Sequence, residues 1–252
     1  MISFRFPGVI FTACSSMPSF SPPLGYSRVK TMGDFRELLA TPFRDGVNAL
    51  CWKRALSGNF SEIVALLDAG EGITAIDDAH LHALRLTPAG DEARTVILDD
   101  LQLLRARGLA PELNCIRNYP RDESATTVRT DVYSFHADSA PVAADTFLCT
   151  YFGAASEGLR NDEACRRVDV PEIRAELLAH FGGADDDDFR VHLQENCYDL
   201  HYTPLPHARP FNFGVGNLWR IAVDSPGSPV PPCIHRAPDD LPGQPPRLLL
   251  IS

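Results

Sequence analysis

The chain has 252 residues, a formal net charge of −10 and 44% hydrophobic residues. This length suits one large domain, or a core with a small helical subdomain, and the composition excludes wholesale disorder. No apolar run approaches the roughly 20 residues that a membrane-spanning helix needs, so we expect no membrane partner. Because an acidic chain repels phosphate backbones, nucleic acid is also disfavoured as a partner, although a local basic groove is compatible with this charge.

The seven cysteines are scattered, and the nearest pair, Cys149 and Cys165, is 16 positions apart. This spacing excludes CxxC pairs and zinc ribbons. An odd number of scattered cysteines is typical of reduced, buried thiols, and we therefore predict a cytoplasmic location.

Residues 1–31 contain three basic residues, no acidic residue and many Ser, Pro and Phe. Their apolar part, residues 9–13, is short for a signal peptide. We interpret 1–31 as a disordered tail or as a mis-assigned start, with translation beginning at Met17 or Met32.

Residues 32–110 have the periodicity of a helical region. His80 and His82 fall two positions apart on one of its helices, where they would face away from each other, and are predicted to be surface histidines. The expected helices are residues 34–39, residues 60–69 capped by Asn59, a short helix capped by Asp77, and a longer helix from Thr87 to Gly108.

Residues 111–252 consist mainly of short β-prone runs, interrupted by a helix at 171–181 and an acidic turn at 185–188. Many short strands after a helical front end predict an α+β fold, with a β-barrel or β-sandwich core and the helices packed outside it. The expected strands are 113–119, 130–135, 145–152, 189–193, 198–202, 218–223 and 247–251.

Three features of this half can form one metal site. His136 and Asp138 are two positions apart on an extended segment, so both side chains can reach one ion. His235 follows 97 residues after Asp138, and Arg247 follows His235 by 12 residues at the start of an apolar run. Two histidines and one carboxylate form the facial triad of non-haem Fe(II) oxygenases, and a buried arginine can hold a dicarboxylate by a bidentate pair.

This order of residues resembles the Fe(II)/2-oxoglutarate-dependent oxygenase superfamily. Residues 216–223 also resemble the turn and strand before the distal histidine in that superfamily, with Asn217 where Asp is common. Residues 130–252 look like an uncharacterised family of bacterial proteins as well. The resemblance implies a double-stranded β-helix, the jelly-roll or cupin-like fold, for residues 111–252.

The resemblance also implies the cofactors and the roles of the site residues. His136, Asp138 and His235 would bind Fe(II), and 2-oxoglutarate would occupy two of the open coordination positions. Arg247 would hold the far carboxylate of this cosubstrate, with Tyr151 or Trp219 lining the pocket and Tyr151 assigned to cosubstrate binding. The implied reaction oxidises a C–H bond of a small-molecule or peptide substrate.

Alternative interpretations remain open. His136 and His235 can instead be ordinary hydrogen-bonded histidines, with Arg247 paired to a surface carboxylate. Asp199 and His201 form a second same-face pair, which would serve as a metal site or substrate-positioning group, or simply as part of a surface strand. The rival function is a non-catalytic, cupin-like module that binds a metal or a small molecule.

Overall fold

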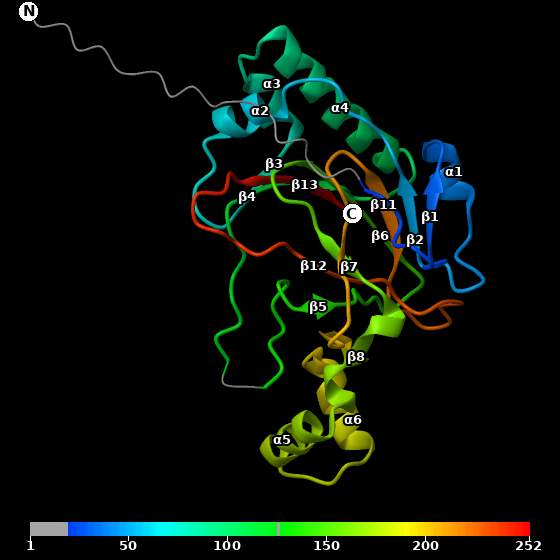
Figure 1. Cartoon of the computed structure of the whole chain (residues 1–252). Coiled ribbons are helices and arrows are strands. Elements are labelled where there is room, and N and C mark those ends of the chain that lie inside the picture. The colour runs from blue at the N-terminus through cyan, green and yellow to red at the C-terminus, as the bar shows by residue number, and fades with distance from the viewer. Residues whose placement is uncertain (1–19, 125–126) are drawn as a thin grey trace, which may run out of the picture.

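The computed structural model describes residues 20–124 and 127–252 (Figure 1). The protein has a mixed α+β architecture with two curled, largely antiparallel sheets, as the sequence predicted for its class. Within the described ranges, none of the helices combines the length and the apolar character needed to span a membrane.

The first sheet has seven strands, and all neighbours are antiparallel except β1 and β2. Its central strand β6 lies between β11 and β13, so segments far apart in the sequence are joined there. In spatial order the strands are β1 (Val29–Met32), β2 (Ala49–Trp52), β11 (Leu218–Ala222), β6 (Asp145–Phe152), β13 (Arg247–Ile251), β4 (Glu112–Ile116) and β3 (Ile73–Ile76).

The second sheet has six short antiparallel strands. Its strands β12 and β5 are direct neighbours, although almost a hundred residues separate them in the chain. In spatial order the strands are β10 (Phe211–Asn212), β7 (Glu157–Leu159), β12 (Ile234–Arg236), β5 (Phe135–His136), β9 (His201–Pro204) and β8 (Ala164–Arg166).

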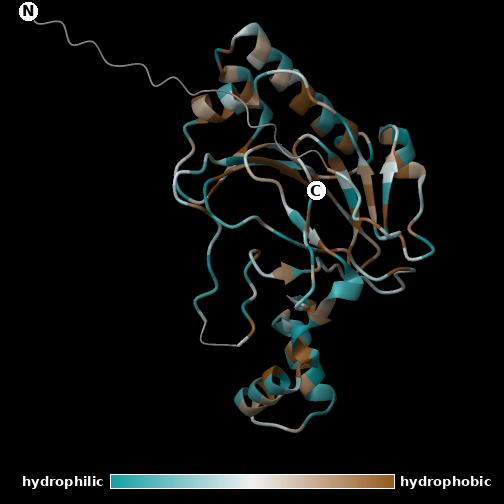
Figure 2. Ribbon diagram, viewed as in Figure 1, coloured by the Kyte–Doolittle hydropathy of each residue, from teal (hydrophilic) through white to brown (hydrophobic). Residues whose placement is uncertain are grey.

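In the described part of the chain, six α-helices lie in two groups at opposite ends of the molecule (Figure 1). The first group packs on the seven-stranded sheet. Three of its helices begin at the predicted caps Asn59, Asp77 and Thr87, and the fourth is capped by Asp34. This group comprises α1 (Phe35–Ala40), α2 (Phe60–Leu67), α3 (Asp78–Ala83) and α4 (Pro88–Arg105). The second group, α5 (Pro171–Phe181) and α6 (Asp187–Glu195), projects away with a small core of its own, and Figure 2 shows its apolar residues.

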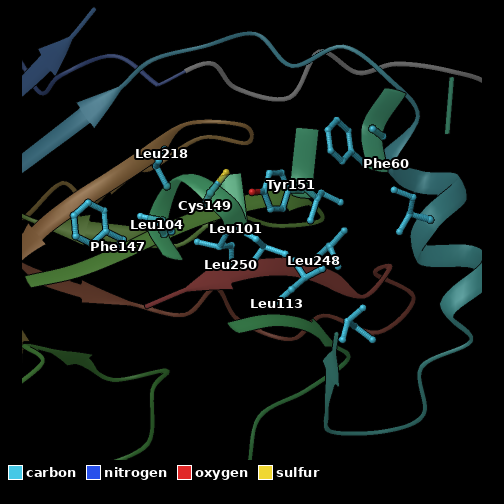
Figure 3. Packing of buried hydrophobic residues seen from close by; sticks show 14 of the residues in the cluster. Phe60, Leu101, Leu104, Leu113, Phe147, Cys149, Tyr151, Leu218, Leu248 and Leu250 are labelled. Carbon is cyan, nitrogen blue, oxygen red and sulfur yellow. The ribbon is translucent and has the colours of Figure 1, made fainter. Parts of the chain in front are cut away.

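The two faces of β6 belong to different parts of the core. Phe147, Cys149 and Tyr151 point toward the helices, where they pack with Leu101 and Leu104 of α4 (Figure 3). The alternating Leu148 belongs to a second apolar cluster, which includes residues of both sheets. The seven-stranded sheet therefore separates the helical layer from an interior that faces the other sheet.

Three predicted strands are wrong or much shorter in the structure. Residues 189–193 form part of α6, because the Asp186 side chain caps this helix by accepting from the backbone N–H groups of Asp188 and Phe189. The acidic run is thus the start of a helix as well as a turn. Residues 198–200 form a 3-10 turn before β9 begins at His201. Of the predicted strand 130–135, only Phe135 lies in a strand, as the first residue of β5 (Phe135–His136).

The predicted helical region, 32–110, also differs from the structure, since it contributes β2 and β3 to the seven-stranded sheet. Residues 20–31, which the sequence placed in a tail, pack into the fold. Phe20 is 2% exposed and meets Trp219 edge to face at a centroid distance of 4.6 Å, and β1 begins at Val29. The tail prediction for residues 1–19 lies outside the described residues.

Candidate metal centre

The pairing of β5 with β12 brings two predicted ligands together. His136 and His235 are direct partners in the antiparallel register of these strands. Directly opposite residues project from the same face of a sheet, and their ring centroids are 4.6 Å apart. Asp138 follows His136 by two positions and points to the same side. Three side chains from two distant segments therefore converge at one place.

The ligand atoms are close enough to share one cation. Oδ1 of Asp138 lies 3.9 Å from Nε2 of His136 and 3.8 Å from Nε2 of His235. One ligand atom from each residue falls within 4.8 Å of the other two, and this is the one such group in the described part of the chain. His136, Asp138 and His235 could therefore hold a metal ion, and two imidazoles with one carboxylate suit a divalent transition metal.

Backbone carbonyl groups orient both histidines. Nδ1 of His136 lies 2.8 Å from the Ser134 carbonyl oxygen. Nδ1 of His235 lies 3.4 Å from the Cys233 carbonyl oxygen. With the proton on Nδ1 donated to these carbonyls, each Nε2 presents its lone pair to the centre.

The electrostatics favour the ligating forms of His136 and Asp138. Burial, followed by the neighbouring His235, lowers the pKa of His136 to about 4, so the ring is neutral at physiological pH. Burial acts to raise the pKa of Asp138, but His235, the hydrogen bond from Thr146 and His136 together hold this pKa below its usual value. A neutral imidazole and an ionised carboxylate are the forms that bind metal.

Arg247 lines the same cavity as the three ligand residues. The cavity has a volume of about 130 Å³, and Tyr119, Ser156 and Leu249 also line it. The Arg247 side chain leaves β13 toward this interior and is 6% exposed. Its guanidinium donates to the hydroxyls of Ser156 at 2.9 Å, Thr150 at 3.2 Å and Tyr119 at 3.2 Å.

Arg247 has no ion-pair partner at short range within the described chain. The charge of Asp240 acts on it only from farther away, and its buried Nε has no hydrogen-bond partner among the described residues. Burial lowers the pKa of Arg247, as expected for a cation removed from water. A buried cation without a direct ion pair is costly, and this one faces a cavity beside a candidate metal site. The arrangement is therefore suited to an anionic ligand.

Tyr151 does not line this cavity, which corrects its predicted role in cosubstrate binding. Its hydroxyl donates to Asp100 at 2.6 Å, and its ring stacks on Phe60 at 5.6 Å on the helical side of the sheet. The reason is strand alternation, because Thr150 faces Arg247 and the next residue must face the other way. Trp219 is also outside the cavity, in the cluster with Phe20.

Tyr119 is the site residue that sequence analysis missed. It falls at the end of the predicted strand 113–119, and its hydroxyl accepts from Arg247 at 3.2 Å. The sequence carries no signal for this contact, since 128 positions separate the two residues. Only the pairing of β4 with β13 places them side by side.

The second predicted pair does not form a site. Asp199 lies in the 3-10 turn before β9, whereas His201 is buried on that strand opposite His136, with ring centroids 5.8 Å apart. His192 lies on α6 against Phe181. His80 is exposed and completes the N-terminal cap of α3, as expected for a surface histidine.

Comparisons with protein-family models, with curated proteins and with solved structures find no match for this chain.

Proposed function

We propose that this chain is an Fe(II)- and 2-oxoglutarate-dependent oxygenase of the hydroxylase type. The observation that carries the proposal is the position of Arg247 across one cavity from His136, Asp138 and His235. A metal site that only binds its ion has no need of a buried guanidinium beside it. An anionic ligand that binds both the Arg247 guanidinium and the metal would explain why the two share one cavity.

The order of the strands supports a double-stranded β-helix as the scaffold. Eight strands, β4, β5, β6, β7, β10, β11, β12 and β13, can be numbered one to eight in chain order. In the first sheet their order is then six, three, eight, one, and in the second it is five, four, seven, two. This is the order produced by the two Greek keys of a jelly roll. The remaining strands, β1, β2, β3, β8 and β9, extend the two sheets outside this set.

The donor set fits Fe(II). His136, Asp138 and His235 would hold the ion, and three protein ligands on one side leave coordination positions open. The two carbonyl-bound imidazoles and the carboxylate fixed by Thr146 are already oriented for this role. Other divalent metals suit the same ligands. We propose iron because Arg247 would bind 2-oxoglutarate, the cosubstrate with which Fe(II) activates O2.

The cavity fits a small dicarboxylate. Arg247 would bind the carboxylate of 2-oxoglutarate that lies farther from the metal, and Tyr119 and Ser156 are placed to share it. Leu148 and Leu249 form an apolar wall that limits water in the cavity. When bound, the metal and 2-oxoglutarate supply the activation of O2 for oxidation of a substrate C–H bond, with succinate and CO2 as the coproducts.

The decisive experiment is succinate formation from 2-oxoglutarate by the full chain loaded anaerobically with Fe(II) and then exposed to O2. We expect slow turnover without a primary substrate, which the variants His136→Ala and Arg247→Ala abolish. His80→Ala, a surface histidine outside the site, is the matched control. If the protein binds a divalent metal but neither binds nor converts 2-oxoglutarate, the proposal is wrong and the non-catalytic, cupin-like binding module replaces it.

A further inference from the structure

A groove of about 650 Å³ lies beside the segment that follows the ligand Asp138. Its walls come from three separate parts of the chain. Ser139 to Pro141 form the first wall, Asp224 to Pro226 form the second, and Gln194 with Asp199 and Leu200 forms the third. The groove is much larger than the cavity at the candidate metal centre, so it can accept a molecule that the inner cavity cannot contain.

Backbone hydrogen bonds connect all three walls to residues 136–138, the segment that carries two of the candidate ligands. The Asp224 N–H donates to the Asp138 carbonyl oxygen at 2.8 Å, and the Ala140 N–H donates to the Asp224 carbonyl oxygen at 2.9 Å. The Ala137 N–H donates to the Leu200 carbonyl oxygen at 2.9 Å. Ser139 and Ala140 directly follow Asp138 in the chain, so this wall of the groove lies next to the backbone of a candidate ligand.

The charged residues that line the groove are acidic. Asp199 and Asp224 line it, and it has no cationic lining residue within the described chain. Neither carboxylate forms an ion pair there; Arg166, the nearest influence of opposite charge on Asp199, is paired with Asp169. Burial, with a smaller contribution from the charge of Asp224, raises the pKa of Asp199. Two carboxylates that repel each other in one groove are stabilised by a bound cation.

We propose that this groove binds the ammonium or guanidinium group of the enzyme's primary substrate. The inference deepens the proposed oxygenase function, because it names the chemical class of the molecule that is oxidised. The cationic end would lie between Asp199 and Asp224, and the carbon to be oxidised would extend toward the metal centre. A free amine and a basic residue within a peptide offer the same chemistry to these two carboxylates.

The first test measures binding to the full chain loaded with Mn(II), at low ionic strength. The probes are Nα-acetyl-lysine amide and Nα-acetyl-arginine amide, each compared with its neutral analogue, the norleucine or citrulline amide. A lysine pentapeptide with glycine at the other positions distinguishes a peptide substrate from a free amine. We expect the cationic probes to bind about tenfold more tightly than the neutral ones, and added salt to reduce this difference.

Two variants and a control test whether the preference for cationic probes comes from the groove. Asp199→Asn and Asp224→Asn should each reduce the affinity for the cationic probes about fivefold, with little effect on the neutral ones. Glu92→Gln removes the same charge from the exposed face of α4 and should change neither. Equal binding of cationic and neutral probes would overturn the inference, as would a loss of affinity in Glu92→Gln equal to that in the groove variants.

The second measurement separates this inference from the proposed function. Succinate formation is recorded with Fe(II) and 2-oxoglutarate, with and without each probe. A charge preference in binding without succinate from any mixture would support the groove and contradict the oxygenase. Succinate formed without a probe, combined with no charge preference in binding or in stimulation, would support the oxygenase and contradict the groove.

Discussion

The Thr146 hydroxyl donates to Oδ2 of Asp138 at 2.6 Å, which leaves Oδ1 of that carboxylate directed at the two histidines. Thr146 is the second residue of β6, in the seven-stranded sheet, whereas Asp138 follows β5 in the other sheet. This single hydrogen bond therefore holds a candidate ligand from the opposite sheet. It also lowers the pKa of Asp138, with His235 contributing more to the same effect.

Replacing Thr146 by Val should weaken metal binding by about 10- to 100-fold, because Asp138 loses the group that fixes its orientation. Thr146→Ser keeps the hydroxyl, so its affinity for the metal should lie within a few-fold of that of the original protein. Titration with Co(II) or Mn(II) measures both. Equal losses in the two variants would mean that packing of the Thr146 methyl group, and not the hydrogen bond, is responsible.

Single replacement of a candidate ligand should remove the site. We expect one divalent ion per chain, and a clear loss of this binding in His136→Ala, Asp138→Ala and His235→Ala. His82→Ala, on the exposed side of α3, should keep full stoichiometry. Metal analysis after dialysis gives the number of bound ions, and retention of the ion in all three variants would contradict the site.

Replacing Arg247 by Met should separate ligand binding from stability. The variant removes a buried cation that has no direct ion pair, so the metal-free protein should be at least as stable as the original, with a gain of about 1 kcal/mol in the free energy of unfolding. It should also lose the rise in melting temperature that 2-oxoglutarate gives the metal-loaded protein. Chemical denaturation and thermal melting measure the two effects. Strong destabilisation would indicate that the three hydroxyl contacts of Arg247 serve the fold.

The segment before β1 should contribute to stability. Phe20 is buried against Trp219, so Phe20→Ala should cost about 3–5 kcal/mol in the free energy of unfolding. A chain that begins at Met32 should be less stable still. Leu24→Ala is the control, since Leu24 is 98% exposed. Unchanged melting temperatures in all three proteins would restore the interpretation of residues 20–31 as a tail.

The buried His201 should make the metal-free protein less stable in acid. Burial, followed by the charge of Arg167, lowers the pKa of His201 to about 4, below its ordinary 6.5. Between these values the unfolded chain binds a proton that the folded chain does not, so stability falls as pH decreases from 6.5 toward 4. His201→Leu should remove up to about 2 kcal/mol of the loss between pH 6.5 and 5. Urea unfolding at both pH values checks this, with the exposed His82→Gln expected to change nothing.

Local signals in the sequence identified the elements that local forces build. Asn59, Asp77 and Thr87 begin helices because each side chain accepts from a backbone N–H within its own first turn. The wrong strand at 189–193 has the same origin, since a short apolar run does not distinguish a strand from a helix. The cap at Asp186 decided that choice in favour of α6.

The sequence by itself also determined which residues could form the candidate site. The two-residue spacing of His136 and Asp138 places both side chains on one side of an extended segment, whatever the rest of the fold does. The apolar run after Arg247 likewise predicted a buried strand, which β13 is. The same alternation could have excluded Tyr151 once Thr150 was known to face Arg247.

Only the tertiary structure decided which of these residues meet. The register of β5 with β12 places His235 beside His136, and the register of β4 with β13 places Tyr119 beside Arg247. Such pairings join segments about a hundred residues apart, and they depend on how both sheets bury their apolar faces together. No local pattern encodes that arrangement, because the stabilising contacts form only when the whole chain has folded.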